Sequence, residues 1–175
     1  MQEINWKKLY SVIDELTPLK SDCGDLCGKK CCRGEAGQGV FLFPGEEKMF
    51  SGEGKWYNVV EYRGQEAHYT GRETFILNCL ADCPRQERPL FCRLFPLAPY
   101  LDENGRLELI LDEDALFICP LVRQGDIQAL DPGFREGVGR VWEELLRNEV
   151  MQKNVREYSA RMKSQMEEPW MKLLK

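Results

Sequence analysis

Histidine is almost absent from this chain, which has a single one, His68, among its 175 residues. One histidine in a polar stretch gives little support to a Ser/His/Asp or Cys/His catalytic constellation, and it excludes metal sites built from several imidazoles. We expect His68 to be a solvated surface side chain rather than a ligand. Catalytic activity therefore has no motif to support it.

Long hydrophobic runs and an excess of basic charge are also missing. No apolar run approaches the roughly 18 residues that a membrane-spanning helix requires, and the N-terminus lacks the basic and apolar regions of a signal peptide. The net charge of −5 provides no basic field for nucleic acid or an anionic membrane. We therefore predict a cytoplasmic protein without nucleic-acid or membrane partners, and a protein partner stays open.

The composition is that of an ordinary globular chain, with 43% hydrophobic and 30% charged residues and no internal repeat. A chain of this length can bury roughly 70% of its unfolded surface, so it needs no covalent staple to hold a core. We predict a single small domain over residues 1–175. Its motif core is expected at about residues 20–120, and a helical segment at about residues 131–168.

Cysteine is abundant, with eight residues in two sets. The first set is Cys-x3-Cys-x3-Cys-Cys, set among Ser, Asp, Gly and Lys rather than on an apolar face. In a reducing compartment such a count indicates metal binding or redox chemistry, and neighbouring cysteines are poor members of a disulfide framework. We expect the fold to bring the sets together around a metal, in one site with spare thiols or in two. The candidate ligands are Cys23, Cys27, Cys31, Cys32, Cys79, Cys83, Cys92 and Cys119.

All-sulfur ligation suits zinc or an iron–sulfur cluster. Two Cys-x3-Cys pairs, at Cys23 and at Cys79, fit a structural zinc site. Three close cysteines with a remote one, and prolines directly after Cys83 and Cys119, fit an iron–sulfur cluster equally well. Both metals therefore remain open from the spacing alone.

Basic residues accompany the cysteines in this otherwise acidic chain. Four thiolates around a divalent ion or a cluster leave a charge of about −2, which nearby cations offset. Arg88 and Arg93 stand among prolines and aromatic residues, so we expect them to have a structural role beside the site. The other basic neighbours are Lys29, Lys30, Arg33 and Arg85.

Hydrophobic periodicity predicts an α+β fold with irregular loops and short strands, centred on the metal. An N-terminal helix is expected over residues 4–17, and a long helix after the Asp131-Pro132 cap, with a break near Asn148. Strands are expected at residues 40–43, 56–62 and 74–77, and a hairpin around Asn104-Gly105. The prolines between residues 84 and 96 exclude a regular helix across that segment.

With these motifs the chain resembles the YkgJ-type cysteine-cluster family, a zinc- or iron-chelating domain. The resemblance covers about residues 20–100. In that family the cluster is usually Cys-x3-Cys-x2-Cys-Cys, whereas here the second gap is three residues, so either Cys31 or Cys32 takes the usual ligand position. The segments that carry the resemblance are the cysteine cluster, Phe43-Pro44-Gly45-Glu46-Glu47, Cys79-x3-Cys83 and Arg88-Pro89-x2-Cys92-Arg93-x-Phe95-Pro96.

The resemblance implies metal binding. Flagellin lysine methylases are similar to this family and carry an iron–sulfur cluster, which favours a cluster here, of the [4Fe-4S] type, over zinc. The main hypothesis is therefore a cytoplasmic iron–sulfur protein. The alternatives are a zinc-stabilised interaction module and a protein-modifying enzyme related to those methylases, although the chain has no glycine-rich S-adenosylmethionine loop of the usual kind.

Overall fold

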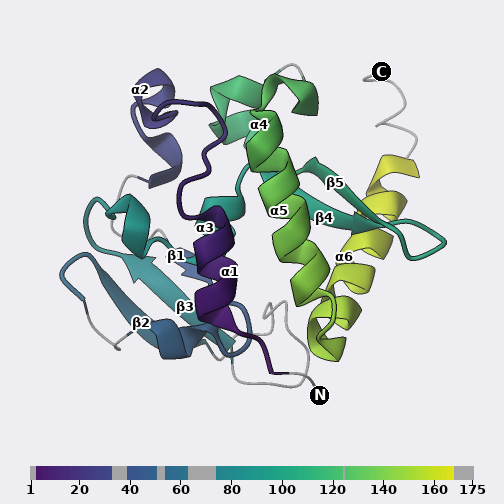
Figure 1. Cartoon of the computed structure of the whole chain (residues 1–175), viewed down its shortest axis with the longest axis horizontal. Coiled ribbons are helices and arrows are strands. Elements are labelled where there is room, and N and C mark those ends of the chain that lie inside the picture. Colours follow the sequence, from purple (N-terminus) through teal and green to yellow (C-terminus); the bar gives the residue numbers. More distant parts are fainter. Residues whose placement is uncertain (1–2, 33–38, 51–53, 63–73, 124, 168–175) are drawn as a thin grey trace.

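The computed structural model describes residues 3–32, 39–50, 54–62, 74–123 and 125–167 (Figure 1). The α-helices are α1 (Trp6–Ile13), α2 (Gly24–Cys27), α3 (Leu90–Leu94), α4 (Ala115–Ile118), α5 (Pro132–Leu145) and α6 (Glu149–Glu167). The strands are β1 (Gly39–Phe41), β2 (Tyr57–Tyr62), β3 (Thr74–Cys79), β4 (Leu97–Leu101) and β5 (Leu107–Leu111). Short 3₁₀ helices are η1 (Lys30–Cys32), η2 (Glu46–Met49), η3 (Arg85–Glu87), η4 (Pro120–Val122) and η5 (Ile127–Ala129). The mixture of helices and strands confirms the predicted α+β class.

The strands form two separate antiparallel sheets. In the three-stranded sheet β3 is central, and Leu77 stands opposite Val40 of β1 and Val59 of β2. Leu77 is fully buried, and a small core gathers on it together with Leu42 and Trp56. The other sheet is the predicted hairpin, in which β4 pairs with β5 across the turn around Gly105.

The larger core lies between α1, α3, α5 and the β4–β5 hairpin. Figure 1 shows α1 and α5 side by side. This approach is close, because a Cβ atom on Gly137 of α5 would lie 3.5 Å from a methyl carbon of Ile13 in α1 and would overlap the side chain of Leu16, which follows α1. The buried side chains of the two helices are Trp6, Leu9, Tyr10, Ile13, Phe134, Val138, Val141, Trp142 and Leu145, as their three- and four-residue spacing predicted.

Helix boundaries follow local capping. The Asp131 side chain accepts a hydrogen bond from the backbone N–H of Phe134, which confirms the predicted start of α5. The predicted break near Asn148 is also present, and the Asn148 side chain accepts from the N–H of Val150 at the start of α6. The N-terminal helix is shorter than predicted, since it ends at Ile13 rather than at residue 17.

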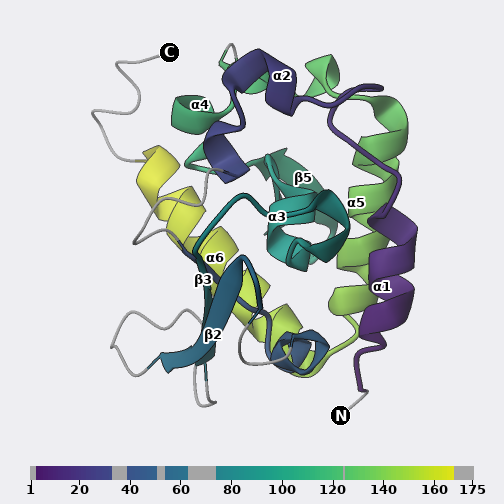
Figure 2. The same cartoon turned by 90° about the vertical axis from the view of Figure 1, so that its left-hand side faces the viewer.

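No helix spans residues 84–96, as the prolines predicted, but one short helix fits between two of them. Helix α3 begins after Pro89 and ends before Pro96. It lies near the middle of the molecule, with α1 and α5 to its right in Figure 2. Its five residues therefore contact several elements at once.

One buried carboxylate, Glu46, joins α1, η2 and α3. Its side chain is 0% exposed. Its Oε1 atom accepts hydrogen bonds from the hydroxyl of Tyr10 at 2.5 Å and from the backbone N–H of Leu90 at 2.7 Å, and its Oε2 atom accepts from the N–H of Phe43 at 2.9 Å. Burial raises the pKa of Glu46, although these donors and nearby Arg93 act in the opposite direction.

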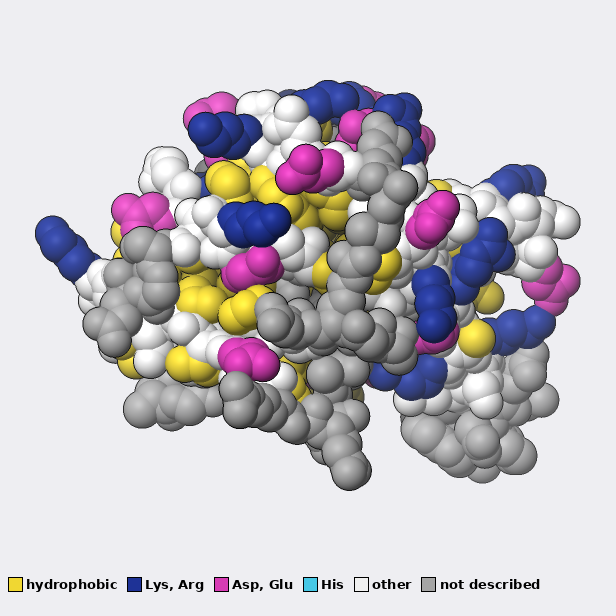
Figure 3. Space-filling view, turned by 90° about the horizontal axis from the view of Figure 1, so that it is seen from below, with side chains coloured by type: hydrophobic (Ala, Val, Ile, Leu, Met, Phe, Trp, Pro, Cys, Tyr) yellow, Lys and Arg dark blue, Asp and Glu magenta, His cyan; other side chains and the backbone are white. Residues whose placement is uncertain are grey.

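The surface mixes hydrophobic and charged side chains. On the face shown in Figure 3, hydrophobic areas are separated by Lys, Arg, Asp and Glu. In the part of the chain that the structure describes, the most exposed large hydrophobic residue is Phe117 of α4, at 82%. Among the described helices, none is both long and apolar enough to cross a bilayer.

Replacing Glu46 by alanine tests its role in joining these elements. The change leaves three buried donors without their acceptor, so we expect the free energy of unfolding to fall by about 3 kcal/mol or more. Chemical denaturation measures this loss. Glu108→Ala, at an exposed position of β5, is the control and should change stability by no more than about 0.5 kcal/mol. Equal effects of the two substitutions would contradict the role of Glu46.

The raised pKa of Glu46 also predicts a pH dependence. Because the folded state holds the Glu46 proton more tightly than the unfolded state does, this group stabilises the fold fully below the usual glutamate pKa of about 4.3. That contribution is lost as the pH rises through the folded-state pKa. Unfolding free energies of wild type and Glu46→Gln, measured over a pH series, should therefore differ most in favour of wild type at acidic pH. A difference that grows with rising pH would contradict the assignment.

Candidate metal centre

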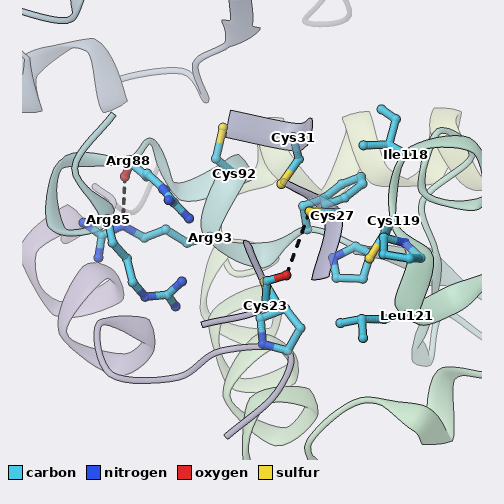
Figure 4. Close-up of a pocket in the computed structure, with 14 residues that line it drawn as sticks. Cys23, Cys27, Cys31, Arg85, Arg88, Cys92, Arg93, Ile118, Cys119 and Leu121 are labelled. Carbon is cyan, nitrogen blue, oxygen red and sulfur yellow. Dashed lines mark hydrogen bonds between the residues drawn. The ribbon is translucent and has the colours of Figure 1, made fainter. Parts of the chain in front are cut away.

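Five of the eight cysteines line one pocket, which we call the thiol pocket (Figure 4). They come from separate parts of the chain: the α2–η1 segment, α3, and the residue after α4. The volume of this pocket is about 30 Å³. The cysteines of the thiol pocket are Cys23, Cys27, Cys31, Cys92 and Cys119.

The first two cysteines are placed together by a single helical turn. Cys23 precedes α2 and Cys27 ends it, and residues four apart lie on the same side of a helix. The Cys27 sulfur lies 3.9 Å from the carbonyl oxygen of Cys23, a contact drawn in Figure 4. Gly28 and Lys29 then take left-handed backbone conformations, with φ of 59° and 57°. This reversal returns the chain so that Cys31 faces the same pocket.

The other two cysteines arrive from distant segments. Cys92 lies on α3, whose first N–H is bound by Glu46. Cys119 follows α4, with its N–H bonded to the carbonyl of Ala115 at 2.8 Å, and Pro120 begins η4 directly after it. Figure 4 shows Cys119 across the pocket from Cys92, with Cys27 and Cys31 between them.

Two thiols of the pocket, those of Cys23 and Cys119, have raised pKa values. Burial raises the pKa of Cys23, and nearby Asp22, Cys119 and Cys27 add to this, while Arg85 opposes it. Burial also raises the pKa of Cys119, and Cys27 adds to the rise. In the absence of added positive charge, these two thiols therefore keep their protons to a higher pH than a free cysteine.

Arg93 holds the segment from Gln86 to Arg88, on one side of the pocket, through hydrogen bonds to its carbonyl groups. It is only 5% exposed. Its Nε donates to the carbonyl of Arg88 at 2.8 Å, and one terminal nitrogen donates to the carbonyl of Gln86 at 2.6 Å. The guanidinium also pairs with Asp14 and lies 4.5 Å over the ring of Tyr10. The structural role predicted for Arg93 is confirmed by these contacts.

Arg85 and Arg88 line the same pocket. Arg85 donates a hydrogen bond to the carbonyl of Leu16, just after α1. Burial lowers the pKa of Arg85, and nearby Arg88 adds to this, whereas Cys23 raises it. Three guanidinium groups thus stand beside five thiols.

The partners of Arg93 on the N-terminal helix were not evident from the sequence. Tyr10 and Asp14 are four residues apart and therefore share a helix face. The four-residue spacing indicates that the two side chains lie on one face of the helix. It does not by itself indicate that they bind an arginine. Nothing local indicates that the guanidinium they meet lies some eighty positions later.

Cys79 and Cys83 do not line the thiol pocket. Cys79 ends β3 opposite Tyr57, and both cysteines pack against the smaller core. Burial raises the pKa of Cys79, and nearby Cys83 adds to this, so these two thiols form a separate pair. The side chain of Cys32 lies outside the described part of the chain, as do Arg33 and His68.

The thiol pocket is not a finished coordination shell. Among the described residues, no three Cys, His, Asp or Glu side chains are placed so that they could hold a metal ion as they stand. The donor set nevertheless suits a soft metal, since five thiols share one pocket with three guanidinium groups. Binding a metal there requires the sulfur atoms to move closer together.

The contacts of Arg93 predict that lysine cannot replace it. Lysine carries one charged nitrogen and lacks the planar fork that reaches two carbonyls and a carboxylate at once. We expect Arg93→Lys to lower the free energy of unfolding by about 2–4 kcal/mol. The control is Arg147→Lys, because Arg147 is an exposed arginine whose ion pair, with the half-buried Glu144, lies at the surface. Thermal and chemical denaturation of both variants check this, and equal stabilities would show that Arg93 is dispensable.

Comparisons with known proteins add no relative. No protein-family model, curated protein or solved structure matches this chain. The resemblance to the YkgJ-type family therefore stays a prediction, which depends on the sequence motifs alone.

Proposed function

We propose that the chain is a cytoplasmic metal-binding protein whose site is the thiol pocket. The observation that carries the proposal is the gathering of five cysteines, from segments nearly one hundred residues apart, around one small space. Cysteines that merely fill a core arrive singly on apolar faces. A reducing compartment keeps such thiols available as ligands.

The charges around the pocket support the same proposal. Thiolates are the form that binds metals, and a bound cation displaces their protons. The raised pKa values of Cys23 and Cys119 mean that the metal has to drive this deprotonation. Four thiolates around a divalent ion leave a charge of about −2, and the three arginines that line the pocket offset it.

The causes of the raised pKa values indicate which thiols of the pocket lie close together. Cys119 and Cys27 lie close enough to Cys23 to add to the rise of its pKa, and Cys27 adds to the rise of the pKa of Cys119 in the same way. These three cysteines form the core of the proposed ligand set, and Cys31 and Cys92 on the same pocket provide the remaining sulfur atoms. Cys79 and Cys83 are left out of this site.

The two candidate metals are supported by different observations. The sequence pattern, three close cysteines with a remote Cys119-Pro120, favours an iron–sulfur cluster. The narrow space of about 30 Å³ favours a single zinc ion, because on this measure one water molecule already needs about 10–15 Å³.

Anaerobic purification followed by iron, sulfide and zinc assays decides between them. Iron and sulfide in matching amounts, with the visible absorbance of a cluster, support the iron–sulfur assignment. A colourless protein with stoichiometric zinc supports the zinc assignment. A protein that binds neither metal, also after reconstitution, would contradict the proposal.

Single cysteine replacements test the location of the site. We expect Cys23→Ser and Cys119→Ser to weaken metal binding by more than about 100-fold. Loss of a group that only hydrogen-bonds to a metal ligand already lowers metal affinity by about 10–100-fold, and loss of a ligand itself should lower it further. Cys79→Ser is the matched control, because its thiol is buried to a similar degree but lies outside the thiol pocket. Competition with a chromophoric chelator measures the affinities. Equal losses in all three variants would place the site elsewhere.

A further inference from the structure

A second cavity, of about 630 Å³, lies between β1, β4 and α6, and we call it the α6 cavity. Strand β4 and helix α6 lie side by side in Figure 1. The volume of the α6 cavity is within the range of small-molecule sites, about 300–1,000 Å³. Among the described residues, none lines both this cavity and the thiol pocket, so the two are separate candidate sites.

Hydrophobic side chains with accessible surface line part of the α6 cavity. Phe91 of α3 is 36% exposed, and its ring packs against that of buried Phe43, with centroids 6.1 Å apart. Val40 and Phe41 of β1 are half-buried and line the same cavity. A ligand with a hydrophobic body gains free energy when it covers such surface and leaves water.

Carboxylates outnumber cationic groups in the wall of the α6 cavity. The charged lining residues are Asp112, Glu113, Asp114, Glu157 and Arg161. Arg161 pairs with Glu113 at 3.2 Å, and Glu157 pairs with Lys153 at 3.8 Å. Within the described part of the chain, Asp112 and Asp114 form no ion pair. The wall therefore keeps negative charge that its own cations do not neutralise.

Asp112 is a half-buried carboxylate with two other carboxylates beside it. Burial raises the pKa of Asp112, and the charges of Asp114 and Glu113 add to the rise. The backbone N–H of Asp114, which donates to Asp112 Oδ1 at 3.0 Å, acts in the opposite direction. A cation in the cavity would reduce this repulsion, whereas an anion would add to it.

We propose that the α6 cavity binds a small hydrophobic amine in its protonated, cationic form. The ammonium group pairs with Asp112 and Asp114, and the hydrophobic body packs against Phe41 and Phe91. The hydrophobic surface alone would accept any hydrophobic molecule, and the carboxylates alone would accept any cation. Their presence in one cavity selects a ligand that has both parts. This proposal does not depend on metal binding at the thiol pocket.

Four probes that differ in charge or in hydrophobic body test the proposal on the wild-type protein. Phenethylamine, which is protonated near neutral pH as a lysine side chain is, should bind at least about tenfold more tightly than phenethyl alcohol, its uncharged counterpart. It should also bind more tightly than ethylamine, which has the charge without the ring, and phenylacetate should bind most weakly. Calorimetry measures the affinities.

The same titrations can overturn the proposal. Equal binding of phenethylamine and phenethyl alcohol would show that the carboxylates do not select a cation. Equal binding of phenethylamine and ethylamine would show that the hydrophobic surface is not used. Tighter binding of phenylacetate, or no saturable binding of phenethylamine, would also contradict it.

Replacing Asp112 by asparagine locates the site. Asparagine keeps an oxygen that accepts from the N–H of Asp114 but removes the negative charge. Asp112→Asn should weaken phenethylamine binding by at least about fivefold, leave binding of phenethyl alcohol unchanged, and keep or raise the melting temperature, because a charge disfavoured by burial is lost. Glu108→Gln, at an exposed position of β5 outside the cavity, makes the same change of charge and should bind as wild type does. An unchanged preference for the amine in Asp112→Asn, or equal losses in both variants, would overturn the proposal.

Discussion

The buried carboxylate of Glu46 is the constraint on which the centre of the molecule depends. It is held in a solvent-free position by donors from α1, from the turn before η2, and from the start of α3. A buried carboxylate is tolerated only when its lone pairs are used. The three segments are therefore required to meet, and α3 is fixed at a point where its few residues face different surroundings.

Because α3 is fixed in this way, the positions of its residues relative to several neighbours are fixed as well. Phe91 lines a cavity between β1, β4 and α6, Cys92 lines the thiol pocket, and Arg93 joins α1 to the η3 segment. Consecutive helical residues point in directions about one hundred degrees apart, so a helix of five residues can serve three neighbours. The flanking prolines keep it short and thereby keep these directions distinct.

Much of the fold could be predicted because its signals are local. The stripe from Trp6 to Ile13, the Asp131 cap and the Asn104-Gly105 hairpin each depend on residues a few positions apart. The thiol pocket could be predicted only in part. The close spacing of Cys23, Cys27 and Cys31 follows from the sequence, whereas the choice of Cys92 and Cys119 over Cys79 and Cys83 depends on how distant segments pack.

The sequence by itself determined the class of fold, the Asp131 cap of α5 and the close spacing of the first cysteines, because each follows from residue type and local spacing. Only the tertiary structure decided which thiols share a pocket and which arginine is buried beside them. The physical reason is that burial and pairing depend on contacts between residues far apart in the chain, and no local pattern specifies them.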